Sequence, residues 1–193
     1  MFLITKPTEE SIKRFIAEQK GCQLSYSEVG ATRNENAPES FTLDHNRVQI
    51  GTGRESFERA IEAVQSWKMF DLGWTKLHFD NTPIEVGQTV AILIKHFGFW
   101  SLNAAQIVYV IDEASDEIEK FGFAYGTLTE HGEQGEERFS VEYHKQDESV
   151  WYDLYAFSQP NHILARLGYP ASRYLQKQFA VESKAAMQKA VQK

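Results

Sequence analysis

The sequence predicts an α+β fold in which a curved antiparallel sheet grips a long C-terminal helix, with an extra helix at the N-terminus. Two observations lead to this prediction. Between residues 121 and 160, three consecutive runs place large apolar side chains at every second position, which is the repeat of a strand with one buried face. After Pro160, a helical pattern with a broad apolar face extends to the C-terminus, and Leu164 and Leu167 lead into it.

The aromatic residues of the three runs have two interpretations. They either line a ligand cavity between the sheet and the helix, because ligand pockets are mostly apolar with a few polar groups, or they pack on the helix as core. Core packing is the simpler interpretation for most of them, but the tyrosine hydroxyls need partners when buried. The candidate ligand-binding residues in these runs are Phe123, Tyr125, Phe139, Tyr143 and Tyr152.

The N-terminal segment forms a separate helix in this prediction. Thr8 is a suitable N-cap before two acidic residues, and one helical face then carries Ile12, Phe15 and Ile16. We therefore divide the chain into an N-terminal helical extension, residues 1–22, and a single α+β domain, residues 23–193. A helix this short docks either on the main domain or on a second copy of the chain, which would give a homodimer.

The following residues contain a long arm, a second helix and further strands. The segment Gln23–Ile50 is polar and has no regular period, so we interpret it as an ordered arm with a short strand at its end. Thr52 and Glu55 have the spacing of a capping box, which predicts that Thr52 caps the second helix. Further apolar runs predict strands within residues 70–79, 90–95 and 107–111.

Composition narrows the classes of function. The 193 residues carry a net charge of −7, which argues against nucleic acids and anionic membranes as partners, because both require a basic surface. Cys22 is the single cysteine, and no apolar run is long enough for a signal peptide or a membrane span. We therefore expect a soluble, cytoplasmic protein. No dinucleotide fingerprint, phosphate loop or nucleophile elbow occurs, so we expect no cofactor.

The most specific inference from the sequence concerns the direction of the Glu137 side chain. Glu137 has the same parity as Phe139 and Tyr143, so a strand that already includes Glu137 directs its carboxylate to the concave side of the sheet. A buried carboxylate needs a partner or a raised pKa. We expect it to anchor a polar group of a ligand or to pair with an arginine such as Arg33. If the strand begins at Arg138 instead, Glu137 is solvated.

Two other groups of residues have competing interpretations. Arg33 lies in the aperiodic arm and is either a lid residue at the mouth of a cavity or a surface arginine that holds the arm down. His131 lies in a glycine-containing loop with three glutamates, a group that can bind a metal or transfer protons. The spacing of this group matches no metal motif, so we expect no metal site.

Four segments resemble the uncharacterised protein family 0548, a domain-of-unknown-function family of bacteria and plants. They are YSEVGATRNENAP (Tyr26–Pro38), GTGRESFERAIEAVQSW (Gly51–Trp67), GFAYGTLTEHGEQGEERFSVE (Gly122–Glu142) and AFSQPNHILARLGYPASRYLQ (Ala156–Gln176). The resemblance covers roughly Gln23 to the C-terminus and implies no reaction, because the family has no assigned catalytic residues. The order of the elements is also similar to START-like helix-grip domains, whose curved sheet and long helix enclose a cavity for an apolar ligand. This second similarity is one of topology alone.

These observations support three hypotheses about function. The first is a binding module that holds a small apolar or amphipathic molecule between the sheet and the C-terminal helix. The second is an enzyme that uses Glu137, Tyr125 or His131 as an acid–base group in the same cavity. The third is an interaction protein whose first helix or arm docks on a partner.

Overall fold

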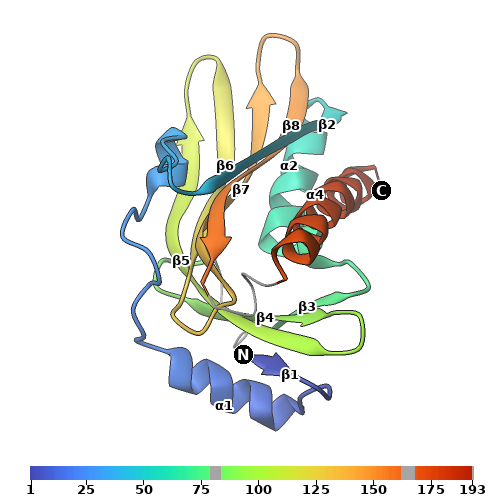
Figure 1. The fold of residues 1–193 in the computed structure, drawn as a ribbon. Helices are drawn as coiled ribbons and strands as arrows, with labels where there is room; N and C mark the ends of the chain where they lie inside the picture. Colours follow the sequence, from blue (N-terminus) through green and yellow to red (C-terminus); the bar gives the residue numbers. More distant parts are fainter. Residues whose placement is uncertain (79–83, 162–167, 193) are drawn as a thin grey trace.

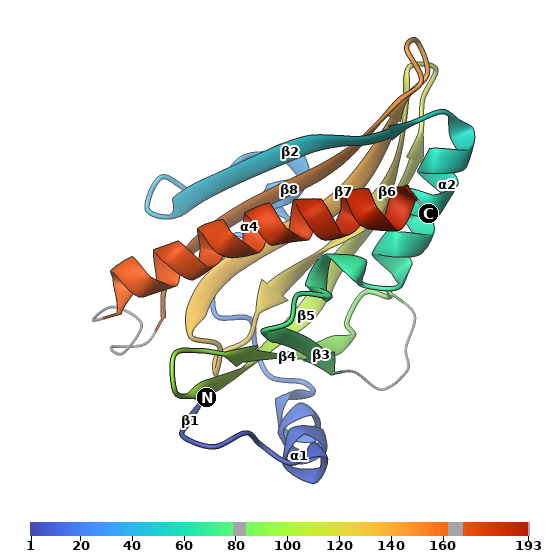
Figure 2. The same ribbon diagram turned by 90° about the vertical axis from the view of Figure 1, so that its right-hand side faces the viewer.

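The computed structural model describes residues 1–78, 84–161 and 168–192 (Figures 1 and 2). Within them, an eight-stranded antiparallel sheet has the order β2-β8-β7-β6-β5-β4-β3, and β1 pairs with the start of β5. The strands are β1 (Phe2–Leu3), β2 (Thr42–Thr52), β3 (Thr75–His78), β4 (Thr89–Lys95), β5 (Trp100–Ala114), β6 (Ile118–Thr127), β7 (Glu133–His144) and β8 (Ser149–Pro160).

The helices lie on both faces of this sheet. On the concave face, α2 (Arg54–Gln65) and α4 (Tyr169–Val191) pack on the strands and on each other, and Figure 2 shows α4 running along the hollow of the bent sheet. A short turn, η2 (Lys68–Phe70), follows α2 and contacts α4. On the convex face lie α1 (Glu9–Gln19) and the turn η1 (Ala31–Asn34). The predicted α+β helix-grip arrangement is therefore confirmed.

The main core lies between α2, α4 and the sheet. The largest fully buried side chains of this core include Tyr152, Phe123 and Phe139 from the sheet and Met187 from α4. Each such side chain contributes about 1.5–3 kcal/mol relative to leaving it exposed. None of the described helices combines the length and the apolar character needed to cross a membrane.

A second, smaller core attaches the N-terminal helix to the convex face. Thr8 caps α1 as predicted, because its hydroxyl accepts the Ser11 backbone N–H at 3.2 Å. The apolar face of α1 packs on β4 and β5. A homodimer therefore remains a prediction that this helix no longer supports. The apolar residues that could have contacted a second copy of the chain are buried within the protein itself. They are Ile12, Phe15 and Ile16.

Two local predictions were wrong. The segment Gln23–Ile50 is not an arm that ends in a short strand, because its residues from Thr42 onward belong to the eleven-residue strand β2. Thr52 does not cap α2, since Gly53 occupies the N-cap position with φ of 81° and without a side-chain hydrogen bond. A positive φ is easily adopted by glycine and turns the chain sharply from β2 into the helix.

The C-terminal helix begins and packs differently from the expected pattern. It starts at Tyr169 with Pro170 in its first turn, where the missing N–H of proline is tolerated. Its fully buried face consists of Ala180, Ser183, Met187 and Val191. The predicted strand end at residue 79 and the helical residues Leu164 and Leu167 lie outside the described residues.

Candidate functional site

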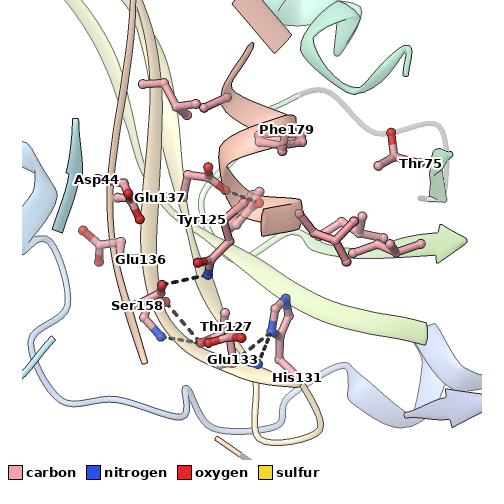
Figure 3. Close-up of a pocket in the computed structure, with 18 of the residues that line it drawn as sticks. Asp44, Thr75, Tyr125, Thr127, His131, Glu133, Glu136, Glu137, Ser158 and Phe179 are labelled. Carbon is pink, nitrogen blue, oxygen red and sulfur yellow. Dashed lines mark hydrogen bonds between the residues drawn. The ribbon is translucent and has the colours of Figure 1, made fainter. Parts of the chain in front are cut away.

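A cavity of about 180 Å³ lies between the sheet and the first half of α4 (Figure 3). Helix α2 packs beside the C-terminal half of α4 (Figure 2), and among the described helices none lies between the first half of α4 and the sheet. The turn after α2 closes one side. Apolar lining residues come mainly from η2, β4, β8 and α4, and they include Phe70, Ile92, Ile94, Leu154, Leu175 and Phe179.

A hydrogen-bonded pair, Tyr125 and Glu137, forms part of the sheet wall of this cavity (Figure 3). The two residues are direct neighbours on β6 and β7, and the Tyr125 hydroxyl donates to Glu137 Oε2 at 2.5 Å. Strand β7 begins at Glu133, so Glu137 lies within the strand and faces the concave side. This confirms the orientation expected from its parity, and the solvated alternative is wrong.

Burial controls the protonation of the pair. Desolvation raises the pKa of Glu137 to about 7, the Tyr125 hydrogen bond opposes this rise, and the negative charge of Asp44 adds to it. The pKa of Tyr125 also lies well above its ordinary value, because burial and the Glu137 carboxylate both disfavour a phenolate. Protein surrounds Glu137, yet its side chain keeps accessible surface where it borders the cavity. A ligand in the cavity can therefore reach a carboxyl group that exchanges its proton near neutral pH.

Polar residues line the cavity near the start of α4. Arg173 Nη1 and Nη2 donate to Asp44 on β2 at 2.5 and 2.6 Å, which ties this end of α4 to the edge of the sheet. Burial raises the pKa of Glu133, against the Ser172 hydrogen bond and the Arg173 charge, and Glu133 Oε2 is buried with no described hydrogen-bond partner. The backbone N–H of Glu133 donates to His131 Nδ1 at 3.0 Å.

Four of the predicted ligand-binding residues lie in the packed core and not among the described residues that line the cavity. Phe123 packs on Trp67 with ring centroids 4.5 Å apart, and Phe139 stacks on Phe123. Tyr143 stacks on a phenylalanine of α2. The hydroxyl of Tyr152 lies 2.8 Å from that of Ser183 on α4. Of the candidates in the three runs, the structure places only Tyr125 beside the cavity.

Arg33 lies on the opposite face of the sheet from the cavity. Its Nη2 donates to Glu113 at 2.8 Å, and its guanidinium lies 5.3 Å from the centre of the Tyr109 ring. The expected pairing with Glu137 and the expected position at the mouth of the cavity are therefore wrong. The alternative interpretation, a surface arginine that holds the arm in place, agrees with these contacts.

The neighbouring residue Glu136 explains why residues 26–36 are ordered. These residues are the part of the predicted arm that lies before β2, and we call them the arm from here on. Its carboxylate is buried on the convex face and accepts hydrogen bonds from the Tyr26 hydroxyl at 2.6 Å, from the Gly30 N–H at 2.7 Å and from the Thr32 N–H at 3.0 Å. The Thr32 hydroxyl donates to it as well. Adjacent glutamates on β7 thus have different roles, since one holds the arm and the other faces the cavity.

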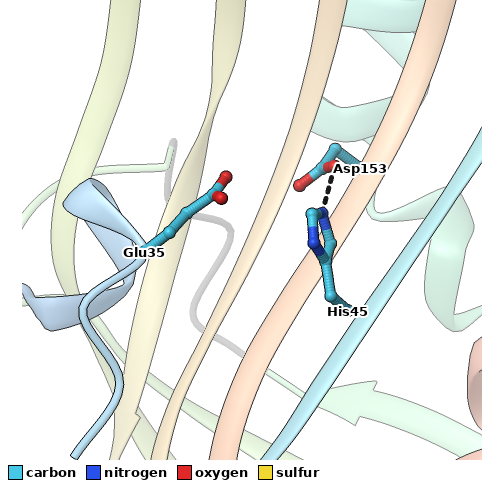
Figure 4. A group of neighbouring side chains, drawn as sticks. All are labelled: Glu35, His45 and Asp153. Atoms are coloured by element: carbon cyan, nitrogen blue, oxygen red, sulfur yellow. Dashed lines mark hydrogen bonds and ion pairs between the residues drawn. The ribbon is translucent and has the colours of Figure 1, made fainter.

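A second polar cluster on the convex face offers three possible metal ligands (Figure 4). The ligand atoms of Glu35, His45 and Asp153 lie within 4.8 Å of one another, and His45 Nε2 lies 2.8 Å from Asp153 Oδ2. However, Arg138 donates to Glu35 at 2.9 Å and to Asp153 at 2.7 Å. A metal cation would meet the positive charge of this guanidinium, so the cluster is better explained as an ion-pair network that fixes the end of the arm.

Sequence reasoning missed several residues that line the cavity. Phe70 and Trp74 come from the segment after α2, where a strand was predicted within residues 70–79 but nothing indicated that these two residues face a cavity. Asp44 and Asn46 come from β2, which was interpreted as part of the arm. Leu175 and Phe179 belong to the broad apolar face predicted for the last helix, and this pattern was the one available signal for them.

Comparison with known proteins identifies the family. The family model described as "Domain of unknown function (DUF1990)" matches residues 25–186. The chain belongs to this family. A UPF0548 protein of Dictyostelium discoideum is 41% identical over 207 residues, covering 99% of this chain and 96% of the relative. A UPF0548 protein of Arabidopsis thaliana is 40% identical over 156 residues, covering 79% of this chain and 75% of the relative. The resemblance found in the sequence is therefore confirmed.

Solved structures show weaker similarity to this chain. A hypothetical protein of Helicobacter pylori is 11% identical with a TM-score of 0.49, covering 85% of this chain and 95% of that chain. Human STARD10 is 12% identical with a TM-score of 0.44, covering 98% of this chain and 81% of that chain. At these levels of similarity, no conclusion about the ligand or activity of this chain follows.

Proposed function

We propose that this protein binds a small, largely apolar molecule in the cavity between the sheet and α4, and that Tyr125 and Glu137 anchor one polar group of that molecule. The observation that carries the proposal is the hydrogen-bonded pair at the wall of an otherwise mostly apolar cavity. Burying a carboxyl group costs free energy, and no described cation lies within ion-pair distance of Glu137 to offset that cost. A bound polar group would supply the missing partner.

The dimensions of the cavity limit the size of the enclosed part of the ligand. An apolar cavity of about 150 Å³ is large enough for a molecule the size of benzene. The cavity of about 180 Å³ therefore accommodates one ring or a short branched chain. The lining residues Ile94, Ser158 and Leu175 are only partly buried, so the cavity is not fully enclosed by protein.

The proposal predicts that filling the cavity abolishes binding. Ala156 lies beside Glu137 in the sheet and lines the cavity, so Ala156→Leu would occupy the space of the ligand. Val181→Leu is the matched control, because Val181 lies on α4 with 64% of its surface exposed. We expect calorimetry with indole as the probe to show binding to the wild type and the control, and at least tenfold weaker binding to Ala156→Leu. Equal affinities for all three proteins, or no binding to the wild type, would contradict the proposal.

One observation favours a second candidate function, acid–base catalysis in the same cavity. A pKa of about 7 for Glu137 allows it to donate or accept a proton at neutral pH, which is the property a general acid or base requires. Under this candidate, a ligand recovered from the wild-type protein after incubation is chemically changed, and Glu137→Gln prevents the change. Mass spectrometry of the recovered ligand distinguishes the two functions, since a binding module returns it unchanged.

A further inference from the structure

The acidic residues that line the cavity are not balanced by basic ones. The carboxylates are Asp44, Glu133, Glu136 and Glu137, and no lysine or arginine occurs among the described lining residues. His131 is the one basic side chain in that set. A low-dielectric cavity with this lining has a negative potential, which attracts cations and repels carboxylates and phosphates.

Two of the four carboxylates already have partners. Asp44 is neutralised by the two hydrogen bonds from Arg173. Glu136 accepts the hydrogen bonds of the arm on the convex face and does not present its carboxylate to a ligand. The negative potential in the cavity therefore depends on Glu133 and Glu137.

Neither of these two carboxylates has a described cationic partner at ion-pair distance. Glu137 is surrounded by protein, and its Oε1 accepts no hydrogen bond from a described residue, since Tyr125 donates to Oε2. Glu133 Oε2 is buried and also lacks a described hydrogen-bond donor. A buried oxygen atom without a donor, such as Glu133 Oε2, is rare in folded proteins and indicates a missing partner, whereas Glu137 keeps accessible surface toward the cavity. The partner that satisfies a carboxylate best is a charged donor such as an ammonium group.

We infer that the cavity takes a small organic cation, a primary amine attached to a single ring or a short apolar chain, with its ammonium group at Glu137 and its apolar body against Phe70, Ile92 and Phe179. This inference rests on the proposed function, because it specifies the chemistry of the ligand in the same cavity. The ammonium group supplies the hydrogen-bond donors that Glu137 Oε1 lacks. Glu133 contributes additional negative charge along β7.

Three matched probes test the inference: 2-phenylethylamine, the neutral 2-phenylethanol and the anionic 3-phenylpropionate. Each has one phenyl ring and a short chain, so they differ mainly in charge. At pH 8, we expect calorimetry to give at least tenfold tighter binding for the amine than for the alcohol. We expect the carboxylate to bind at least tenfold more weakly than the alcohol, because its charge is repelled by Glu133 and Glu137.

The pH dependence of amine affinity identifies the residue that causes the preference for the amine. The amine binds the ionised form of Glu137, whose pKa is about 7 in the free protein, so its affinity should fall about tenfold from pH 8 to pH 6 while that of the alcohol stays constant. The other ionisable groups near the site are Tyr125, Tyr152, Asp44, Glu133, Glu136, Arg173 and His131. Protonation of His131 would also weaken amine binding at low pH, and Glu137→Gln separates the two causes. If Glu137 is responsible, this variant loses both the preference for the amine and the pH dependence, and binds the alcohol within about threefold of wild type.

The possible outcomes distinguish the inference from the function on which it rests. Tighter binding of the amine that disappears in Glu137→Gln supports both. Equal or tighter binding of the alcohol by the wild type, or a preference for the amine that persists in Glu137→Gln, overturns the inference and leaves the proposed cavity standing. Binding of none of the three probes overturns both. Glu10→Gln, a change to an exposed residue of α1, is the control for the loss of one negative charge.

Discussion

Replacing Glu137 by glutamine should remove a specific part of the pH dependence of stability. The glutamine side chain can still accept the Tyr125 hydroxyl hydrogen bond, but it has no proton to lose. In the wild type, the pKa of Glu137 rises from an ordinary value of 4.5 to about 7, mainly because the group is buried. Between these two values the folded protein binds more protons than the unfolded chain, so wild-type stability decreases as the pH rises through this interval.

The magnitude follows from the size of the shift. One pKa unit corresponds to about 1.4 kcal/mol, so the full rise is worth about 3 kcal/mol across the interval. Between pH 5.5 and pH 8, a range in which the unfolded chain is already ionised, the wild type should lose about 2 kcal/mol relative to the variant. The loss should level off above about pH 8.

Urea unfolding at several pH values measures this difference. The free energies of unfolding of the wild type, Glu137→Gln and the control Glu10→Gln are compared at each pH, so that other carboxylates cancel. We expect the difference between the wild type and Glu137→Gln to change by about 2 kcal/mol, and that between the wild type and the control to stay constant. A constant difference for Glu137→Gln would show that Glu137 is ionised throughout and that its environment is not desolvating.

Three further substitutions test the arm and the core. Glu136→Ala should destabilise the protein by about 3 kcal/mol or more and expose the amides of the arm to hydrogen exchange, because the arm's donors lose their shared acceptor; an unchanged unfolding midpoint would refute this role. Gly126→Ala would force a methyl group against the Tyr26 hydroxyl and should accelerate exchange in the arm, whereas exchange as slow as in the wild type would mean that Tyr26 is not needed there. Tyr152→Phe removes the hydrogen bond to Ser183 and should cost about 1 kcal/mol in urea unfolding without changing indole affinity. A loss of indole affinity in this variant would count against the position of the cavity.

The sheet that carries the site was predictable because its strands follow a simple repeat. Phe123 and Phe139 face each other across β6 and β7, and Tyr125 and Glu137 occupy the next position on the same face. The parity of Glu137 relative to Phe139 was therefore enough to place its carboxylate on the concave side. Tyr125 was a candidate because of its aromatic ring and not as a partner of Glu137. Only the register of β6 and β7 shows that the two residues meet.

The first part of strand β2 could not be predicted from a hydrophobic pattern, because its inward-facing residues are polar until Val48 and Ile50. Asp44 and Asn46 face α4, where they contact Arg173 and Lys184. These partners lie more than a hundred residues later in the chain, so local periodicity contains no sign of them. The same distance in sequence explains why Glu136 was not recognised as the acceptor that orders the arm.

The boundary between the packed core and the cavity also could not be predicted from the sequence. Phe139 and Tyr125 have the same parity and similar size, yet Phe139 is buried against its neighbours and Tyr125 borders the cavity. The difference arises from which part of the sheet α2 covers. That position depends on the turn at Gly53 and on the packing of α2 against α4, and both are properties of the assembled fold.

Methyl NMR during a titration with 2-phenylethylamine tests the central claim most directly. If the hollow between the sheet and α4 is the binding site, chemical shifts should change at the methyl groups that line it, those of Ile92, Ile94, Leu154 and Leu175. The methyl groups of the second core on the convex face should stay unchanged, and they belong to Leu93, Leu102 and Leu128. Shifts confined to that second group, or no shifts at saturating amine, would contradict the account.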